Sequence, residues 1–216
     1  MLRFIAAACL VLSVTACTKQ DNPVPSTGTT PTTQPPVTPV TPTTPTTPAD
    51  PYAGYTAYRI STGNNYCDGN TYPFGSFTKL QFKVIFDSSC IYTNANPSNQ
   101  ADINKLYGFA DSGSFHQQNS ARFGWNWQNG KMHIHAYCYV HGERQYKELG
   151  TVPLGLAQDC TLEVTPGKYV FTLNGKKETV SRGCEEAVAR GYKLFPYFGG
   201  DEPAPHNVVI RIKDIQ

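Results

Sequence analysis

The segment from Asn119 to His141 constrains the fold more than any other part of the sequence. Asn129-Gly130 separates two runs of alternating polar and apolar residues, and an Asn-Gly pair in that setting is the strongest short-range signal for a β-hairpin. Side chains alternate between the two faces of a strand, so the second run divides into two sets. One set is apolar and is expected to face a hydrophobic core: Met132, Ile134, Ala136, Cys138 and Val140.

The other set on the same strand carries three imidazoles and two phenols: His133, His135, Tyr137, Tyr139 and His141. Such groups are costly to bury without hydrogen-bonding partners, whereas they suit the wall of a water-filled groove. We therefore predict that this strand lines a solvated groove with one face and covers a hydrophobic core with the other. His206, in a loop rich in glycine and proline, is expected to reach the edge of this groove.

Further alternating segments are typical of short strands, and a second Asn-Gly pair at 174–175 predicts another hairpin. The segments expected to be strands are 55–60, 80–86, 103–109, 146–154, 160–164, 168–173, 176–180, 192–198 and 208–213. Residues 185–190 are expected to form one helical turn. Many short strands with almost no helix predict an all-β fold for residues 51–216, an antiparallel two-sheet β-sandwich of the concanavalin-like jelly-roll type.

Residues 1–16 have the pattern of a secretory signal peptide. Arg3 gives a positive start, and the apolar run that follows is too short to span a bilayer. The order Val14-Thr-Ala-Cys17 resembles the bacterial lipobox, and this resemblance implies cleavage before Cys17 and lipid attachment to that cysteine. We therefore expect a lipid-anchored protein of the cell envelope. An acidic residue soon after the lipidated cysteine would be a signal for retention in the inner membrane. Lys19 is not acidic, which favours the outer membrane.

Residues 17–50 are predicted to be a tether between the anchor and the domain. Thr and Pro dominate this stretch, and it has no apolar periodicity from which a core could form. Proline favours extended polyproline II structure at ~3.1 Å per residue.

The cysteines fit an exported, oxidising setting. Of the seven, Cys9 leaves with the signal peptide and Cys17 is lipidated. The other five cannot all pair within one chain, so at least one thiol is left over. Cys138 is expected to be free because it lies on the apolar face of its strand. The remaining four are predicted to form two disulfides, Cys67–Cys90 and Cys160–Cys184.

Charge and motifs exclude several classes of function. The formal net charge of +2 gives no basis for binding nucleic acid by bulk charge. The sequence contains no P-loop, no dinucleotide fingerprint and no Gly-x-Ser-x-Gly elbow. The glutamates of the domain also lack the Glu-x-Asp-x-x-Glu spacing of sandwich-fold glycosidases. No cofactor is predicted.

Four segments occur in an order that resembles one group of polysaccharide lyases: Asn104-Lys-Leu-Tyr-Gly-Phe109, Ser120-Ala-Arg122, Asn129-Gly130 and Tyr137-Cys-Tyr139. That group comprises jelly-roll enzymes acting on alginate and glucuronan, and the resemblance covers Asn104 to Val140. The whole domain, including the stretch from Tyr197 to His206, also resembles surface lipoproteins of the Bacteroidetes type. The lyase resemblance places five residues at catalytic positions: Lys105, Ser120, Arg122, Tyr137 and Tyr139.

The resemblance implies β-elimination on an acidic polysaccharide. Arg122 and Lys105 are expected to bind the C6 carboxylate, because a guanidinium fork matches its two oxygens. Tyr137 or Tyr139 would act as base and acid, with the nearby cations lowering the pKa of a phenol. Ser120 would donate a hydrogen bond to the carboxylate or to the sugar.

Three alternatives stay open from the sequence. The groove could bind a glycan through stacking tyrosines, with His133, His135, His141 and His206 as further substrate contacts and without catalysis. His133, His135 and His141 could share a zinc ion, although no acidic partner is near in sequence and we predict no metal. The domain could also be a purely structural surface protein.

Overall fold

The computed structural model describes residues 50–215 of the 216-residue chain. The predicted signal peptide, Cys17 and all but the last residue of the predicted tether lie outside the described residues. Within the described part, no helix is long and apolar enough to cross a membrane.

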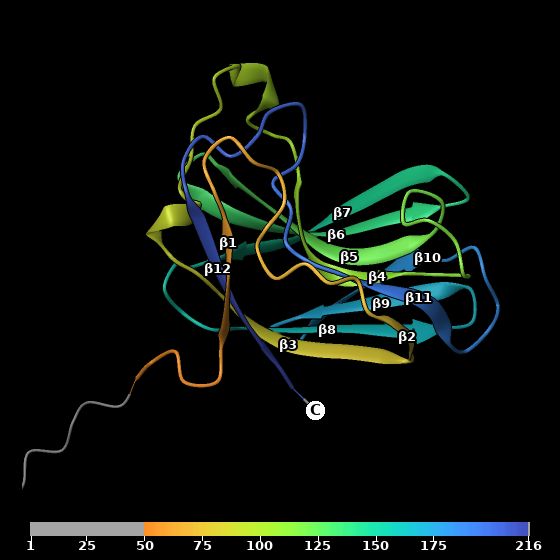
Figure 1. Ribbon diagram of the computed structural model, residues 1–216. Helices are drawn as coiled ribbons and strands as arrows, with labels where there is room; N and C mark the ends of the chain where they lie inside the picture. The colour runs from red at the N-terminus through yellow and green to blue at the C-terminus, as the bar shows by residue number, and fades with distance from the viewer. Residues whose placement is uncertain (1–49, 216) are drawn as a thin grey trace, which may run out of the picture. The chain divides into compact units, whose positions relative to one another are not determined.

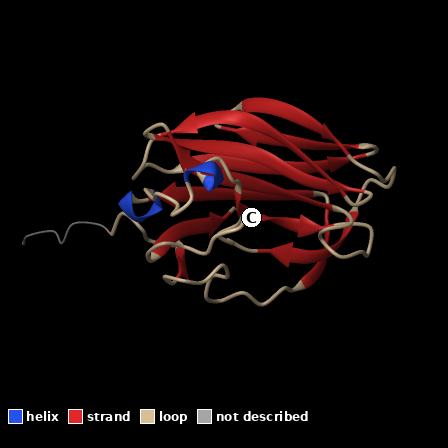
Figure 2. Ribbon diagram, turned by 90° about the horizontal axis from the view of Figure 1, so that it is seen from above, coloured by secondary structure: helices blue, strands red, loops and turns tan. Residues whose placement is uncertain are grey.

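Residues 50–215 form two antiparallel sheets of six strands each (Figure 1). The first sheet has the order β1 (Thr56–Ile60), β12 (Val208–Asp214), β3 (Lys79–Phe86), β8 (Gln158–Thr165), β9 (Lys168–Leu173) and β10 (Lys176–Ser181). The second sheet has the order β2 (Phe74–Phe77), β11 (Ala189–Leu194), β4 (Asn104–Ala110), β5 (Ser120–Gln128), β6 (Lys131–Val140) and β7 (Glu143–Val152). Helix is limited to the short 3₁₀ turns η1 (Ser88–Cys90) and η2 (Pro97–Asn99), drawn in blue in Figure 2.

The core between the sheets is built from aromatic and aliphatic side chains of both. Phe123 of β5 lies edge-on to Phe82 of β3 and Phe171 of β9, with ring centroids 5.4 and 5.1 Å apart. Phe86 and Trp125 also meet across the layer, with tilted rings whose centroids lie 5.8 Å apart. Such edge-to-face pairs add about 0.5–1.5 kcal/mol each beyond the burial of their area.

The predicted two-sheet β-sandwich is confirmed, and so is the division of β6 into two faces. The five apolar residues of β6 belong to the core, and none is more than 9% exposed. Asn129 and Gly130 both have positive φ, 52° and 71°, as the tight turn between β5 and β6 requires. The second predicted hairpin, β9–β10, is also formed.

Three segments differ from the prediction. The strand expected at 192–198 is β11, which starts and ends earlier, at Ala189 and Leu194. Phe74–Phe77 forms the edge strand β2, which the sequence did not indicate because most of its side chains are exposed and it shows no alternation. The helical turn expected at 185–190 is wrong. The Arg182 guanidinium donates hydrogen bonds to the carbonyls of Glu186 and Val188, which holds this segment in an irregular path into β11.

The two predicted disulfides are wrong: Cys67, Cys90, Cys138, Cys160 and Cys184 are all free. Cys160 begins the β8–β9 ladder opposite Leu173, whereas the Cys184 carbonyl accepts from the Gly167 amide at the other end of that hairpin. Five strand residues at ~3.3 Å each separate the ends, far more than a disulfide spans.

Cys67 and Cys90 are kept apart by two strands. Cys67 pairs with Ile60 on the outer side of β1, while the Cys90 thiol donates to the Val209 carbonyl on β12. Cys138, predicted to be free, is a fully buried thiol on the core face of β6.

A buried ion pair joins the loop after β4 to the segment after β10. Arg182 and Asp111 are 5% and 1% exposed, and Nε of Arg182 lies 2.6 Å from Oδ2 of Asp111. The same carboxylate oxygen accepts the Tyr169 hydroxyl at 2.6 Å. Burial by itself raises the pKa of Asp111, but the hydrogen bonds from Arg182 and Tyr169 outweigh it and hold that pKa below its usual value. This network closes one end of the sandwich.

Candidate functional site

A pocket of about 260 Å³ lies on the outer face of the second sheet. Register places its floor, because Arg122 on β5 is directly opposite Tyr137 on β6, and Tyr139 lies two residues further on the same face. Lys105 of β4 completes the floor. The structure thus brings together four of the five residues that the lyase resemblance selected.

Three loops form the walls of the pocket. They carry Tyr66, Asn70 and Tyr72 from the loop after β1, His116 and Gln117 from the loop after β4, and Tyr197 and Gly200 from the loop after β11. Figure 1 shows these loops beside the sheet formed by β4, β5 and β6. The lining contains no Asp or Glu.

Arg122 is a buried cation that makes no ion pair with the described residues. Its side chain is 6% exposed, and its Nε is buried without a hydrogen-bond partner. The guanidinium carbon lies 5.6 Å from the centroid of the Tyr137 ring. Burial lowers the pKa of Arg122, but a guanidinium stays charged in proteins. A buried charge without a partner is costly, and an anionic ligand would remove that cost.

Lys105 is the second cation of the pocket. Its Nζ lies 5.1 Å from the centroid of the Tyr137 ring and 5.8 Å from that of Tyr197. Burial, together with the positive charges of Arg122 and Arg144, lowers the pKa of Lys105 to about 8. Paired backbone hydrogen bonds of 2.9 Å with Tyr197 fix the position of Lys105 on β4.

The two tyrosines of β6 lie together on the pocket floor, with ring centroids 5.9 Å apart. The nearby cations lower the pKa of Tyr137, as expected, but the pKa as a whole is raised rather than lowered. Burial, together with its neighbour Tyr139, raises the pKa of Tyr137 to about 12, and Arg122 offsets this only in part. Tyr137 is therefore a protonated phenol at neutral pH, which makes it a hydrogen-bond donor or an acid rather than a base.

Ser120 does not line the pocket. It is fully buried, and its hydroxyl donates a 2.6 Å hydrogen bond to the carbonyl of His116. Its place at the start of β5 therefore lets it hold the loop that carries His116, rather than contact a ligand in the pocket.

The four histidines predicted to bind substrate also lie outside the pocket lining. His133 Nδ1 lies 2.9 Å from Glu148 Oε1, and His135 Nε2 lies 2.9 Å from Asn126 Oδ1, both further along the sheet. His141 lies in the turn after β6, packed against Gly183. His206 Nε2 lies 2.9 Å from the carbonyl of Ile91.

The zinc alternative finds no support in the geometry. Within residues 50–215, no three His, Cys, Asp or Glu side chains are grouped so that they could hold a metal ion. His133 and His135 lie on the same face of β6 but face different partners, a carboxylate and an amide.

His116 and Tyr197 are pocket residues that sequence reasoning missed. The His116 amide donates to the Tyr192 hydroxyl at 3.0 Å, and its Nδ1 lies 2.8 Å from the same oxygen. Burial and the charge of Arg122 lower the pKa of His116, so the ring is neutral at pH 7. No sequence pattern marks His116. Tyr197 falls in the strand expected at 192–198, but the strand ends at Leu194, so Tyr197 belongs to the loop that follows it.

No family model matches the chain, and no curated protein matches it. Among solved structures, the fold is similar to that of the alginate lyase AlyC3, with a TM-score of 0.53 and 12% identity over 77% of this chain and 75% of that chain. For the same lyase in complex with dimannuronate, the TM-score is 0.49 and the sequence identity is 11%, over 78% of each chain. For LamAcat from Zobellia galactanivorans, the TM-score is 0.48 and the sequence identity is 11%, over 74% of this chain and 75% of that chain.

The predicted resemblance to jelly-roll alginate lyases is thus confirmed as a likeness of fold. At these identities the match to AlyC3 establishes the sandwich architecture and carries no residue of its active site to this chain. What the pocket does must be inferred from the side chains that line it.

Proposed function

We propose that the pocket binds the carboxylate of an acidic polysaccharide, a polyuronide. The observation that carries this proposal is the buried guanidinium of Arg122, which shares with Lys105 a pocket without any carboxylate. A guanidinium fork can donate two parallel hydrogen bonds to a carboxylate, and such charge-assisted bonds are about twice as strong as neutral ones. The pocket is therefore pre-organised for a planar anion.

The rest of the lining favours a sugar acid over a small inorganic anion. Five tyrosines line the pocket: Tyr66, Tyr72, Tyr137, Tyr139 and Tyr197. Aromatic faces pack against the apolar faces of sugar rings, while phenol hydroxyls bond to sugar hydroxyls. Asn70 adds a buried Oδ1 that has no hydrogen-bond donor among the described residues. A sugar hydroxyl would satisfy it.

A second candidate is cleavage of the bound polymer by β-elimination. Tyr137 and Lys105 favour it, because the pocket moves their pKa values apart, to about 12 and about 8. Neutral Lys105 would take the C5 proton, the electrons would form the C4–C5 double bond, and the C4–O4 bond would break. Tyr137 would protonate the leaving O4. The carboxylate would then rest on Arg122 alone.

Matched pairs of polymers test binding and cleavage separately. Alginate is the first polymer to use, because a lyase of this fold acts on it. We expect calorimetric titration to detect binding of alginate and glucuronan, and little binding after chemical reduction of their carboxyl groups to alcohols. Equal affinity for native and reduced polymers would contradict the proposal. A rise in the absorbance of unsaturated uronate would identify a lyase, and binding without it identifies a binding module.

The affinity for a uronate is expected to fall as the pH rises above about 8. A bound carboxylate favours the charged form of Lys105, so the ligand binds more tightly to the protonated protein. By linkage, the association constant falls by up to about tenfold per pH unit between the pKa of the free protein and the higher pKa of the complex. Titrations from about pH 7 to about pH 9.5 should show this in the wild type. Lys105→Met should bind more weakly with a flat profile, and an equally steep profile in that variant would refute the assignment.

Gly199 is expected to position Lys105. A β-carbon at Gly199 would lie 2.2 Å from Lys105 Nζ, and the other close atoms also belong to this lysine side chain. Because the far end of a lysine can move aside, Gly199→Ala should displace the ammonium and change the free energy of unfolding by less than about 1 kcal/mol. The affinity for alginate should fall about tenfold, the value of one charge-assisted hydrogen bond. Unchanged affinity in a folded variant would show that the position of Lys105 does not matter.

We also propose that the chain is a lipoprotein anchored in the outer membrane through Cys17. The Val14-Thr-Ala-Cys17 order supports this, and the predicted tether would let the domain reach polymers away from the membrane surface. Metabolic labelling with a fatty acid should mark the wild type but not Cys17→Ser. Label retained in Cys17→Ser would contradict the anchor.

A further inference from the structure

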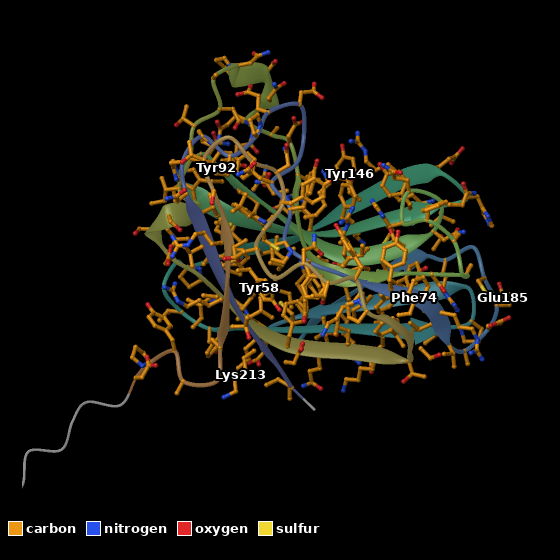
Figure 3. All side chains as sticks on the ribbon, viewed as in Figure 1. Tyr58, Phe74, Tyr92, Tyr146, Glu185 and Lys213 are labelled. Atoms are coloured by element: carbon orange, nitrogen blue, oxygen red, sulfur yellow. The ribbon has the colours of Figure 1, made fainter. Side chains whose placement is uncertain are left out.

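The pocket that holds Arg122 and Lys105 is called the cationic pocket below. An open apolar hollow of about 330 Å³ lies next to it. We call it the aromatic shelf, and it is lined by Tyr72, Phe74, Phe115, His116 and Tyr192. Phe74 and Phe115 are each 80% exposed, which is unusual for two phenylalanines on one patch. Figure 3 labels Phe74, which lies on β2 at one edge of the second sheet, the opposite edge from Tyr146 on β7.

The shelf is held by strand pairing and hydrogen bonds. Phe74 on β2 is paired with Tyr192 on β11, and their ring centroids lie 5.5 Å apart. The Tyr192 hydroxyl in turn binds the backbone amide and the ring of His116, next to Phe115. Exposed phenylalanines on such a fixed support lose little conformational freedom when a ligand packs on them.

Tyr72 is held in a strained conformation between the shelf and the pocket. Its φ of 46° lies in the left-handed region, which is a genuine outlier for a bulky residue. Its hydroxyl accepts a 2.7 Å hydrogen bond from Asn70, and its ring lies edge-on to Tyr192 at 5.8 Å. Backbone strain of this kind persists where surrounding contacts impose it, and it clusters at ligand sites.

The shelf and the cationic pocket are continuous, since Tyr72 and His116 line both. A ligand whose carboxylate rests on Arg122 and which extends past these two residues reaches Phe74 and Phe115. The two hollows differ in chemistry, because the pocket holds both cations and the shelf exposes only apolar surface. This is the pattern expected for a polysaccharide ligand, in which one sugar is recognised by its charge and the neighbouring sugar by the apolar face of its ring.

We propose that the aromatic shelf is a second sugar subsite, which packs against the apolar face of the residue adjoining the bound uronate. The proposal rests on the function proposed above and deepens it, because it assigns the ligand as an oligomer rather than a single sugar acid. A second copy of the chain or another protein is a poorer occupant. A stable protein interface buries at least about 1,000 Å², whereas the shelf offers two exposed rings in one small hollow.

Calorimetric titration with alginate oligosaccharides of two to six residues tests this subsite. The variants are Phe74→Ala, Phe115→Ala and the double variant, and Leu156→Ala is the control because Leu156 is an exposed hydrophobe outside the site. In the wild type and the control, affinity should rise about tenfold once the oligomer is long enough to cover the shelf. The shelf variants should lose this rise and bind the shortest ligand that the wild type binds with unchanged affinity.

Three results would overturn the proposal. If the shelf variants keep the full rise with length, the subsite is wrong while uronate binding stands. If the wild type binds no oligosaccharide of any length, the proposed function fails and the subsite fails with it. If sedimentation shows that the wild type self-associates and that Phe115→Ala is monomeric, the shelf is an interface between copies instead. Thermal melts matching the wild type confirm that each variant is folded.

Discussion

Replacing Arg122 with methionine is expected to weaken alginate binding about a hundredfold, which corresponds to about 2.8 kcal/mol. The same change should leave the free energy of unfolding unchanged or raise it by about 1 kcal/mol. It removes a buried charge that makes no ion pair in the described part of the chain, and this gain offsets the loss of the cation–π contact with Tyr137. Methionine keeps an unbranched apolar side chain in place of the arginine stem. Loss of function without loss of stability distinguishes a ligand-binding arginine from a structural one.

The measurement pairs calorimetric titration of alginate with urea unfolding of the same preparations. Arg59→Met is the matched control, because Arg59 is an exposed arginine on β1 in the other sheet. Its binding and stability should both equal those of the wild type. The interpretation of Arg122 is wrong if Arg122→Met binds normally, or if it loses several kcal/mol of stability.

Arg182→Met is expected to have the opposite effect, with a loss of about 3–5 kcal/mol of stability. Arg182 is as buried as Arg122, but it pairs with Asp111, and removing it leaves that carboxylate buried with a negative charge and fewer partners. The loss should be greatest at neutral pH. The folded-state pKa of Asp111 is lowered, so the stability from this pair is present above the usual Asp pKa and disappears as the pH falls through the folded value.

Urea unfolding at neutral pH and at about pH 3 tests both parts of this prediction. The difference between the wild type and Arg182→Met should shrink at the lower pH, where Asp111 in the variant is protonated. Arg190→Met is the control. The Arg190 side chain is 68% exposed, and its Nε lies 3.9 Å from Oε2 of Glu186, which makes a surface ion pair worth about 0–1 kcal/mol. A cost for Arg182→Met no larger than that of Arg190→Met would contradict the role given to this network.

The strands that alternate were predictable, and so was the face of β6 on which Tyr137 and Tyr139 lie. The alternation of polar and apolar residues and the Asn-Gly turn are local signals that determine the strands and their faces. Burial of one face then fixes the register between the strands. The pattern could not indicate β2, because Phe74–Phe77 has exposed side chains and becomes a strand only by pairing with β11. Tertiary context decides such edge strands.

Contacts between residues far apart in the sequence account for the remaining errors. Arg182 and Asp111 are 71 residues apart, and His116 reaches the pocket through the hydroxyl of Tyr192, 76 residues away. The cysteine pairings failed because spacing along the chain does not reveal that Cys160 and Cys184 lie at opposite ends of one hairpin. The expected pKa of Tyr137 failed because burial, which the sequence does not give, outweighs Arg122.

A crystal structure of the domain with an alginate trisaccharide tests the central claim most directly. We predict one carboxylate within about 3 Å of the Arg122 guanidinium and of the Lys105 ammonium, which is the usual length of a charge-assisted hydrogen bond. The adjoining sugar should lie over Phe74 and Phe115. A trisaccharide bound on another face, with Arg122 still unpaired, would contradict the account.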